Sequence, residues 1–253
     1  MSEARLHEWL LGAMVLLALA AFLRLLVRPA PYGRHGADKT PGPTLSPRFG
    51  WVLMESPSVV AFGAAYLSAP RPIDAALAAF FVMWQAHYVH RAFVFPSRLR
   101  RATPMPLFVC ALGAVFTGLN GWLNGRGITA LHAPYGDVWL RDPRFVLGVV
   151  LFVAGSAINR HADRALLRLR PPGETGYKVP HGGLFRWVSC PNYFGELVEW
   201  CGWAVATWSL PGAVFVVWSA ANLVPRALAH HRWYRAQFTD YPADRKALIP
   251  FVL

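Results

Sequence analysis

The chain has 253 residues, of which 55% are hydrophobic and only 15% charged, and its formal net charge is +12. Soluble domains carry about a quarter charged residues, so this composition excludes a disordered, collagen-like or disulfide-stapled protein and indicates several membrane spans. The Lys and Arg excess is compatible with nucleic-acid binding, but these residues separate apolar runs, which favours a role in membrane topology. Cys110, Cys190 and Cys201 have no C-x-x-C spacing and predict neither disulfides nor zinc.

Seven apolar runs predict an all-α polytopic membrane protein with seven transmembrane helices, forming a single domain over residues 1–253. In chain order the runs cover residues 6–27, 49–69, 73–95, 105–123, 145–167, 193–209 and 213–230. The fifth run turns polar before it ends, which predicts a helix that continues out of the hydrocarbon. Residues 29–48, rich in Pro and Gly, and residues 171–192, bounded by prolines, are expected to form irregular loops.

The distribution of basic residues predicts the orientation of these helices. The first, third and fifth loops and the carboxyl-terminal tail are rich in Arg and Lys, whereas the second holds only Arg71 and the sixth none. By the positive-inside rule, the amino terminus lies outside and the carboxyl terminus in the cytosol. The fourth loop, which contains Arg126, Arg141 and Arg144, is the exception to this pattern.

Polar side chains inside the second and third runs are candidate functional residues, because they are costly in a bilayer. Glu55 lies in the second run, and Trp84, Tyr88, Arg91 and Phe95 share one helical face in the third. Taken singly, Glu55 is compatible with a structural hydrogen bond and Tyr88 with core packing. Together, a buried phenol and a carboxyl can polarise a carbonyl oxygen, so we expect them to meet, one hydrogen-bonded to the other.

Three later helices each carry a polar stripe at what is predicted to be their cytosolic end. The stripes are Asn159, Asp163 and Arg170; Asn192, Glu196 and Glu199; and Asn222, Arg226, His230 and Tyr234. Solvated helix ends that pair with one another are one interpretation. A ligand with sugar hydroxyls, an amide and phosphates is the other, because Arg forks match phosphate oxygens. No strand followed by G-x-G-x-x-G and no Walker loop is present, which excludes a soluble nucleotide-binding fold.

Four histidines, His87, His90, His230 and His231, raise the alternative of a membrane di-iron centre. One H-x-x-H and one H-H pair supply too few ligands for such a centre. We therefore expect no metal site.

Several longer motifs carry a family resemblance. They are GETGYKVPHGGLFRWVSCPNYFGE at 173–196, Glu199-Trp200, ATWSLP at 206–211, DYPADRKALIPF at 240–251, HYVHR at 87–91 and Glu55-x-Pro57. These segments resemble steroid 5α-reductases, the 3-oxo-5α-steroid 4-dehydrogenase family, and the resemblance extends over nearly the whole chain. The Ala-, Arg-, Pro- and Gly-rich composition is typical of a bacterial member, which implies a bacterial inner membrane.

The resemblance implies an enzyme that uses NADPH to reduce the Δ4 double bond of a 3-oxo steroid. It assigns polarisation of the C3 carbonyl to Glu55 and Tyr88. Substrate contacts are implied at Trp51, Met54, Trp84 and Arg91, and cofactor contacts at Asn159, Asp163, Arg170, Tyr177, Asn192, Glu196, Arg226, His230 and Tyr234. Residues 1–100 are expected to form mainly the steroid-side helices, and residues 101–253 mainly the NADPH-binding helices and loops. Met54 stands where the family commonly has Gln.

In the implied reaction, hydride moves to C5, the polarised C3 oxygen takes the developing charge, and C4 is then protonated. We expect a steroid or sterol-like lipid as substrate, contact with membrane lipid, no nucleic acid and no obligate protein partner. One alternative is an isoprenylcysteine or phospholipid methyltransferase-like enzyme, which shares the Pro-Asn-Tyr-x-Gly motif and uses S-adenosylmethionine. Another is a non-catalytic sterol-binding membrane protein, which would bind lipid without nucleotide.

Overall fold

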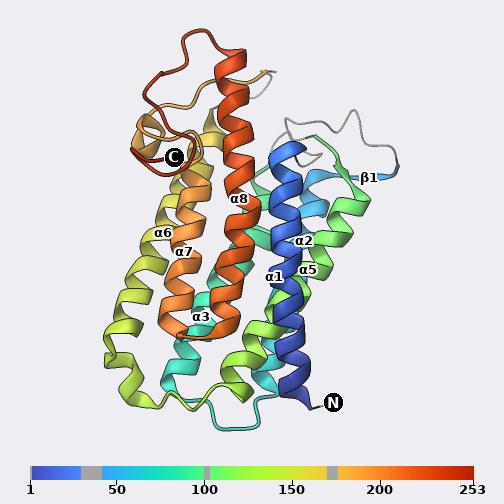
Figure 1. Cartoon of the computed structure of the whole chain (residues 1–253), viewed down its shortest axis with the longest axis vertical. Coiled ribbons are helices and arrows are strands. Elements are labelled where there is room, and N and C mark those ends of the chain that lie inside the picture. The colour runs from blue at the N-terminus through green and yellow to red at the C-terminus, as the bar shows by residue number, and fades with distance from the viewer. Residues whose placement is uncertain (1, 30–41, 100–102, 170–175) are drawn as a thin grey trace.

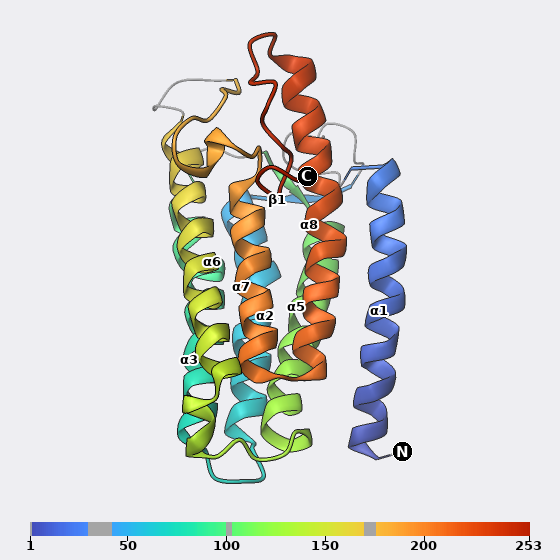
Figure 2. The same cartoon turned by 60° about the vertical axis from the view of Figure 1, so that its left-hand side comes forward.

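The computed structural model describes residues 2–29, 42–99, 103–169 and 176–253. The seven apolar runs form helices that stand side by side in one bundle (Figures 1 and 2). These are α1 (Glu3–Val27), α2 (Pro47–Leu67), α3 (Ala75–Val89), α5 (Leu107–Arg126), α6 (Pro143–Arg168), α7 (Pro191–Thr207) and α8 (Leu210–Gln237). Shorter elements are the π-helical turns His90–Val94 and Gly127–Leu131, α4 (Phe95–Ser97) and the 3-10 turns Asp137–Arg141 and Gly183–Arg186.

Within the described residues, four helical segments are long and apolar enough to cross a membrane: α1, Leu107–Leu131, α6 and α8. They indicate an integral membrane protein, but they do not confirm seven spans. The other three helices lie in the same bundle and differ from these four in identifiable ways. A π-turn interrupts α3 after 15 residues, α7 has 17 residues, and α2 contains Glu55 and Pro57. Membrane crossing by α2, α3 and α7 therefore stays a prediction.

A two-stranded sheet departs from the predicted all-α fold. Strand β1 (Thr44–Leu45) pairs antiparallel with β2 (Met105–Pro106), and Leu107 N donates to Pro43 O at 2.9 Å. The first and third loops are thereby joined at one end of the bundle. Part of the predicted irregular loop 29–48 is thus a strand, while its residues 30–41 lie outside the described chain.

The exceptional charges of the fourth loop have local partners. Arg126 donates to both carboxylate oxygens of Glu3 at 2.6 and 2.8 Å, at the end of the bundle that holds the amino terminus (Figure 2). Arg144 donates to Asp142, and these hydrogen bonds lower the pKa of Asp142 to about 2. Two of the three arginines are thus paired with carboxylates, and the orientation inferred from the basic loops stays a prediction.

Glycines bring α6 and α7 into backbone contact. Gly148 and Gly155 of α6 face backbone atoms of Ala206 and Glu199, and Gly195 of α7 faces the backbone of Asn159. Any side chain at these positions would collide with the opposite helix. Small residues permit such close approach between membrane helices, and the result is that polar residues near the end of α6 lie directly against the start of α7.

Gly155→Ala should test this packing. The added methyl would meet the Glu199 backbone, so the helices must separate, which typically costs about 1–3 kcal/mol. We expect a lower unfolding temperature in detergent. Gly12→Ala in α1 is the matched control, because nothing lies within 4 Å of its added methyl. Equal unfolding temperatures for both variants would contradict the close contact.

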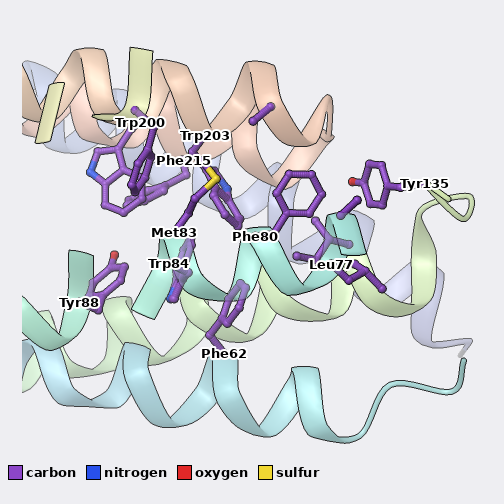
Figure 3. Packing of buried hydrophobic residues seen from close by; sticks show 14 residues of the cluster. Phe62, Leu77, Phe80, Met83, Trp84, Tyr88, Tyr135, Trp200, Trp203 and Phe215 are labelled. Carbon is purple, nitrogen blue, oxygen red and sulfur yellow. The ribbon is translucent and has the colours of Figure 1, made fainter. Parts of the chain in front are cut away.

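Aromatic side chains fill the interior between α2, α3, α7 and α8 (Figure 3). Trp84 stacks on Phe62 with 4.7 Å between ring centroids and donates from its indole to Ser58 at 3.2 Å. Trp203 donates to the Asn124 side chain at 2.8 Å. Because both indole N–H groups have acceptors, the tryptophans can be buried without loss of hydrogen bonds.

Candidate active site

The polar stripes of α6 and α7 meet in one cluster. Asn159 donates to the Asn192 carbonyl at 3.0 Å and to Glu196 at 3.3 Å. Asn192 donates in turn to Asp163 at 3.1 Å. The Glu196 side chain keeps 17% of its surface exposed, so this mutually paired cluster still offers a carboxylate to a ligand.

Arg91 joins this cluster to the helices of the first half. Its guanidinium lies 3.1 Å from Asp163 and 3.7 Å from Glu196. It also lies 4.5 Å from the Trp51 ring centroid and 4.9 Å from that of Phe95. These contacts occur where α3 gives way to the π-turn His90–Val94. The prediction of one regular helix through residue 95 was wrong here, and π-turns of this kind are frequent at functional sites.

Tyr88 lies in the interior, 3% exposed, and its hydroxyl points across the bundle toward Trp200 (Figure 3). Asn120 of α5 donates to the Tyr88 hydroxyl at 3.5 Å. Glu55 of α2 is partly exposed and is close enough to act electrostatically on both Tyr88 and Arg91. The predicted direct hydrogen bond between Glu55 and Tyr88 was wrong, because none joins these two described residues, and the Tyr88 hydroxyl accepts from Asn120 instead.

His87 and Glu199 form a second buried pair beside Tyr88. His87 Nδ1 lies 3.0 Å from Glu199 Oε1, and the His87 ring packs on Trp200 at 4.4 Å. Glu199 is only 1% exposed, and neither of its oxygens has a well-aligned donor in the described chain. Glu199 therefore does not join Asn192 and Glu196 in the cluster with α6, as the predicted stripe implied. It faces His87 of α3 instead.

The remaining substrate candidates have packing roles in this structure. Trp84 is fully buried in the aromatic interior. Met54 packs with Met105 and Cys110 between α2 and α5, and its side chain faces Gly113. Substrate contact by either residue stays a prediction.

The remaining cofactor candidates lie on and around α8. His230 is 3.3 Å from the Tyr193 hydroxyl, and Arg226 lies 5.5 Å from the Tyr193 ring centroid. Tyr234 stacks on Tyr241, while Tyr177 packs edge-on against Trp233. Arg170 lies outside the described residues.

Sequence reasoning missed Asn120 and the His87–Glu199 pair. Thr117, Asn120 and Asn124 lie at spacings of three and four in an apolar run, so the stripe itself was a readable signal. The His87–Glu199 pairing had no such signal, because it depends on which helix packs against α3. No group of three or more His, Cys, Asp or Glu residues within the described ranges could hold a metal ion.

These observations define a helical integral membrane protein with a buried centre of phenol, amide, carboxyl and guanidinium groups. The family model described as 3-oxo-5-alpha-steroid 4-dehydrogenase matches residues 103–253. The chain therefore belongs to the 3-oxo-5-alpha-steroid 4-dehydrogenase family, oxidoreductases of steroid metabolism, which confirms the resemblance seen in its motifs.

Similar relatives come from primates and from a plant. The chain is 41% identical to 3-oxo-5-alpha-steroid 4-dehydrogenase 1 of Macaca fascicularis, covering 100% of both chains. It is 42% identical to 3-oxo-5-alpha-steroid 4-dehydrogenase 2 of Homo sapiens, over 96% of each. It is 40% identical to Steroid 5-alpha-reductase DET2 of Gossypium hirsutum, over 99% of each.

Proposed function

We propose that this protein reduces the Δ4 double bond of a 3-oxo steroid to the 5α-reduced 3-oxo product, with NADPH as hydride donor. Full-length similarity to proteins named for this activity supports the proposal. The observation that carries it is the placement of Glu55 and Tyr88 on neighbouring helices, within electrostatic reach of each other. Arg91 connects this region to the polar cluster of α6 and α7.

The α6–α7 cluster has the chemistry that NADPH requires. Asn159 and Asn192 supply amides, Asp163 and Glu196 supply carboxylates, and these groups suit ribose hydroxyls and a carboxamide. Arg226, His230 and Tyr234 on α8, with Tyr177 and Arg170, complete the proposed set, because phosphates need cationic partners. When bound, the nicotinamide would supply the hydride.

Among the protein's own residues, Tyr88 is the proposed donor to the substrate carbonyl. Because Asn120 donates to the Tyr88 oxygen, the phenolic proton remains available for the C3 carbonyl of the substrate. A protonated Glu55 would donate a second hydrogen bond to the same oxygen, and charge that develops on this oxygen would then be stabilised. With a hydride delivered to C5, C4 would take a proton from water. Buried rings such as Trp84 and Trp200 keep the region dry, which strengthens these electrostatic interactions.

Incubation of the purified full-length chain with progesterone and NADPH tests the proposal. We expect a 5α-reduced product that carries a deuterium at C5 when the nicotinamide hydride is deuterated. Steroid binding without turnover or NADPH binding would favour the sterol-binding alternative. Methyl transfer from S-adenosylmethionine, with no steroid reduction, would favour the methyltransferase alternative.

Two asparagines should separate cofactor binding from catalysis. Asn192→Ala removes an amide from the α6–α7 cluster and should weaken NADPH binding by about 2–10-fold, the typical net value of one hydrogen bond. Asn120→Ala removes the partner of Tyr88 and should lower turnover without changing NADPH affinity. Isothermal titration with NADPH and steady-state rates measure the two effects. Unchanged NADPH affinity in Asn192→Ala would argue against this cofactor site.

We further propose seven spans in a bacterial inner membrane, with the amino terminus outside and the carboxyl terminus in the cytosol. The basic first, third and fifth loops support this orientation. A phosphatase reporter fused after Leu253 should be inactive, because it functions only outside the cytosol. An active fusion would reverse the orientation.

A further inference from the structure

A cationic cleft lies outside the proposed catalytic region, at the end of the bundle where α7 begins. Its volume is about 570 Å3, and it is lined by His181, Gly182, Gly183, Arg186, Trp187, Pro242 and Arg245. None of these lining residues is acidic, and none belongs to the proposed NADPH or steroid contacts. The cleft is therefore lined by cationic side chains and shares no lining residue with the proposed reaction site.

Two distant segments form this cleft. Ser189 N donates to Lys246 O and Lys246 N to Trp187 O, both at 2.8 Å, so the carboxyl-terminal segment is held against the residues before α7. Figure 1 shows this segment folded over the ends of α6 and α7. Gly182 and Gly183 adopt positive φ angles of 84° and 50° and leave the rim without bulky side chains.

Arg245 is the unusual residue of the cleft. Its side chain lines the cavity although the residue is only 3% exposed. The guanidinium lies 4.8 Å from the Tyr241 ring centroid, which fixes its orientation. Nε and Nη1 have no hydrogen-bond partner in the described part of the chain. A buried guanidinium without an acceptor is costly, so these two donors indicate an anionic ligand.

The surroundings indicate that this anion belongs to a lipid. Trp187 lines the cleft and is 38% exposed, and Phe251 beside it is 76% exposed. The rings of Trp187 and Phe251 lie 5.9 Å apart. Exposed Trp next to Arg is typical of the interface between water and bilayer, where apolar side chains meet acyl chains and cations meet headgroups.

We propose that this cleft binds the phosphate of an anionic phospholipid headgroup. Arg245 supplies the buried donor fork, because a guanidinium matches phosphate oxygens in geometry. Arg186 and His181 lie at the exposed rim, and Trp187 and Phe251 contact the acyl region. The lipid would hold the carboxyl-terminal segment against the segment that leads into α7.

Lipid titration of the purified full-length chain tests this site. The probe is dioleoylphosphatidylglycerol added to the protein in neutral detergent, with bound lipid counted by native mass spectrometry. Arg186→Gln should weaken binding about fivefold, the usual contribution of one interfacial cation, and Arg245→Gln at least about tenfold. Lys246→Gln is the matched control, because it removes the same charge from an exposed neighbour that does not line the cleft, and should change binding less than about twofold.

Each competing outcome has a distinct result. Equal phosphatidylglycerol binding by wild type and Arg186→Gln would contradict the proposed lipid site. If Arg245→Gln fails to fold, the result for Arg186→Gln alone tests the proposal. Equal binding of phosphatidylcholine would overturn the preference for an anionic lipid. Displacement by inorganic phosphate at millimolar concentration would identify a free phosphate as the ligand. Displacement by NADPH would assign the cleft to the cofactor instead, whereas we expect NADPH to leave the lipid count unchanged.

Discussion

Tyr88→Phe should lower the turnover of a 3-oxo-Δ4 steroid by about 10²–10³, the usual loss when one donor to a developing oxyanion is removed. The ring packing against Trp84 and Trp200 is kept, so the protein should still fold. NADPH affinity should also be kept, because the proposed cofactor contacts lie on α6, α7 and α8 and around Tyr177. Single-turnover rates with saturating NADPH measure the chemical step directly.

Tyr135→Phe is the matched control for this experiment. Tyr135 is a second buried tyrosine of the same aromatic cluster, and its hydroxyl donates to the Thr207 carbonyl at 2.8 Å. Burial raises the pKa of Tyr135, so it is a neutral donor, as Tyr88 is proposed to be. Its loss should reduce stability by about 1 kcal/mol without affecting the chemical step. Near-normal turnover in Tyr88→Phe would contradict the proposed catalytic role of the Tyr88 hydroxyl and leave Tyr88 with a packing role only.

Glu55→Gln should distinguish two roles of the carboxyl. If Glu55 donates a proton to the substrate oxygen or orients the Tyr88 phenol, turnover should fall nearly as far as in Tyr88→Phe. If it only accepts a hydrogen bond, the loss should be smaller. The double variant should lose little more than the worse single variant, because groups that act as a unit are not additive. Additive losses would indicate two independent contributions.

The positions of the helices were readable from the sequence because apolar runs set them. Each of the seven runs contains the core of one helix, and the polar end of the fifth run does continue as α6. Helical spacing also grouped Asn159 with Asp163 on α6 and Asn192 with Glu196 on α7, and these two faces do meet. Their roles in binding stay proposals.

The contacts between helices could not be read in the same way. The π-turn after Val89 inserts a register shift that periodicity does not reveal, and it aims Arg91 at α6 and α7. The choice of α7 as partner of α6 depends on glycines seven residues apart, at 148 and 155 and at 195 and 202. That spacing is visible in the sequence, but it identifies α6 and α7 as partners only once the structure shows these glycines facing each other. The pairing of Glu199 with His87 likewise depends on how α7 is placed against α3, which the sequence does not show.

Arg91→Met should be the most destabilising substitution in the candidate site. Arg91 is paired with Asp163 and Glu196 between helices, and its removal leaves two largely buried carboxyl groups without their cation. Loss of one partner from a buried ion pair typically costs about 3–5 kcal/mol. Met keeps much of the side-chain length beside Trp51 and Phe95, so the loss should reflect charge. The readouts are the unfolding temperature in detergent and NADPH affinity, both of which should fall.

Arg126→Gln provides the contrast in the same chain. Arg126 binds Glu3 through two short hydrogen bonds, but the Glu3 side chain is 42% exposed, and exposed pairs contribute about 0–1 kcal/mol. This variant should therefore unfold close to the wild-type temperature. Adding Asp163→Asn to Arg91→Met should recover part of the lost stability, because it removes one of the unpaired charges. If Arg91→Met unfolds like Arg126→Gln, the buried network does not hold the two halves of the bundle together, and the polar cluster of α6 and α7 is stable without α3.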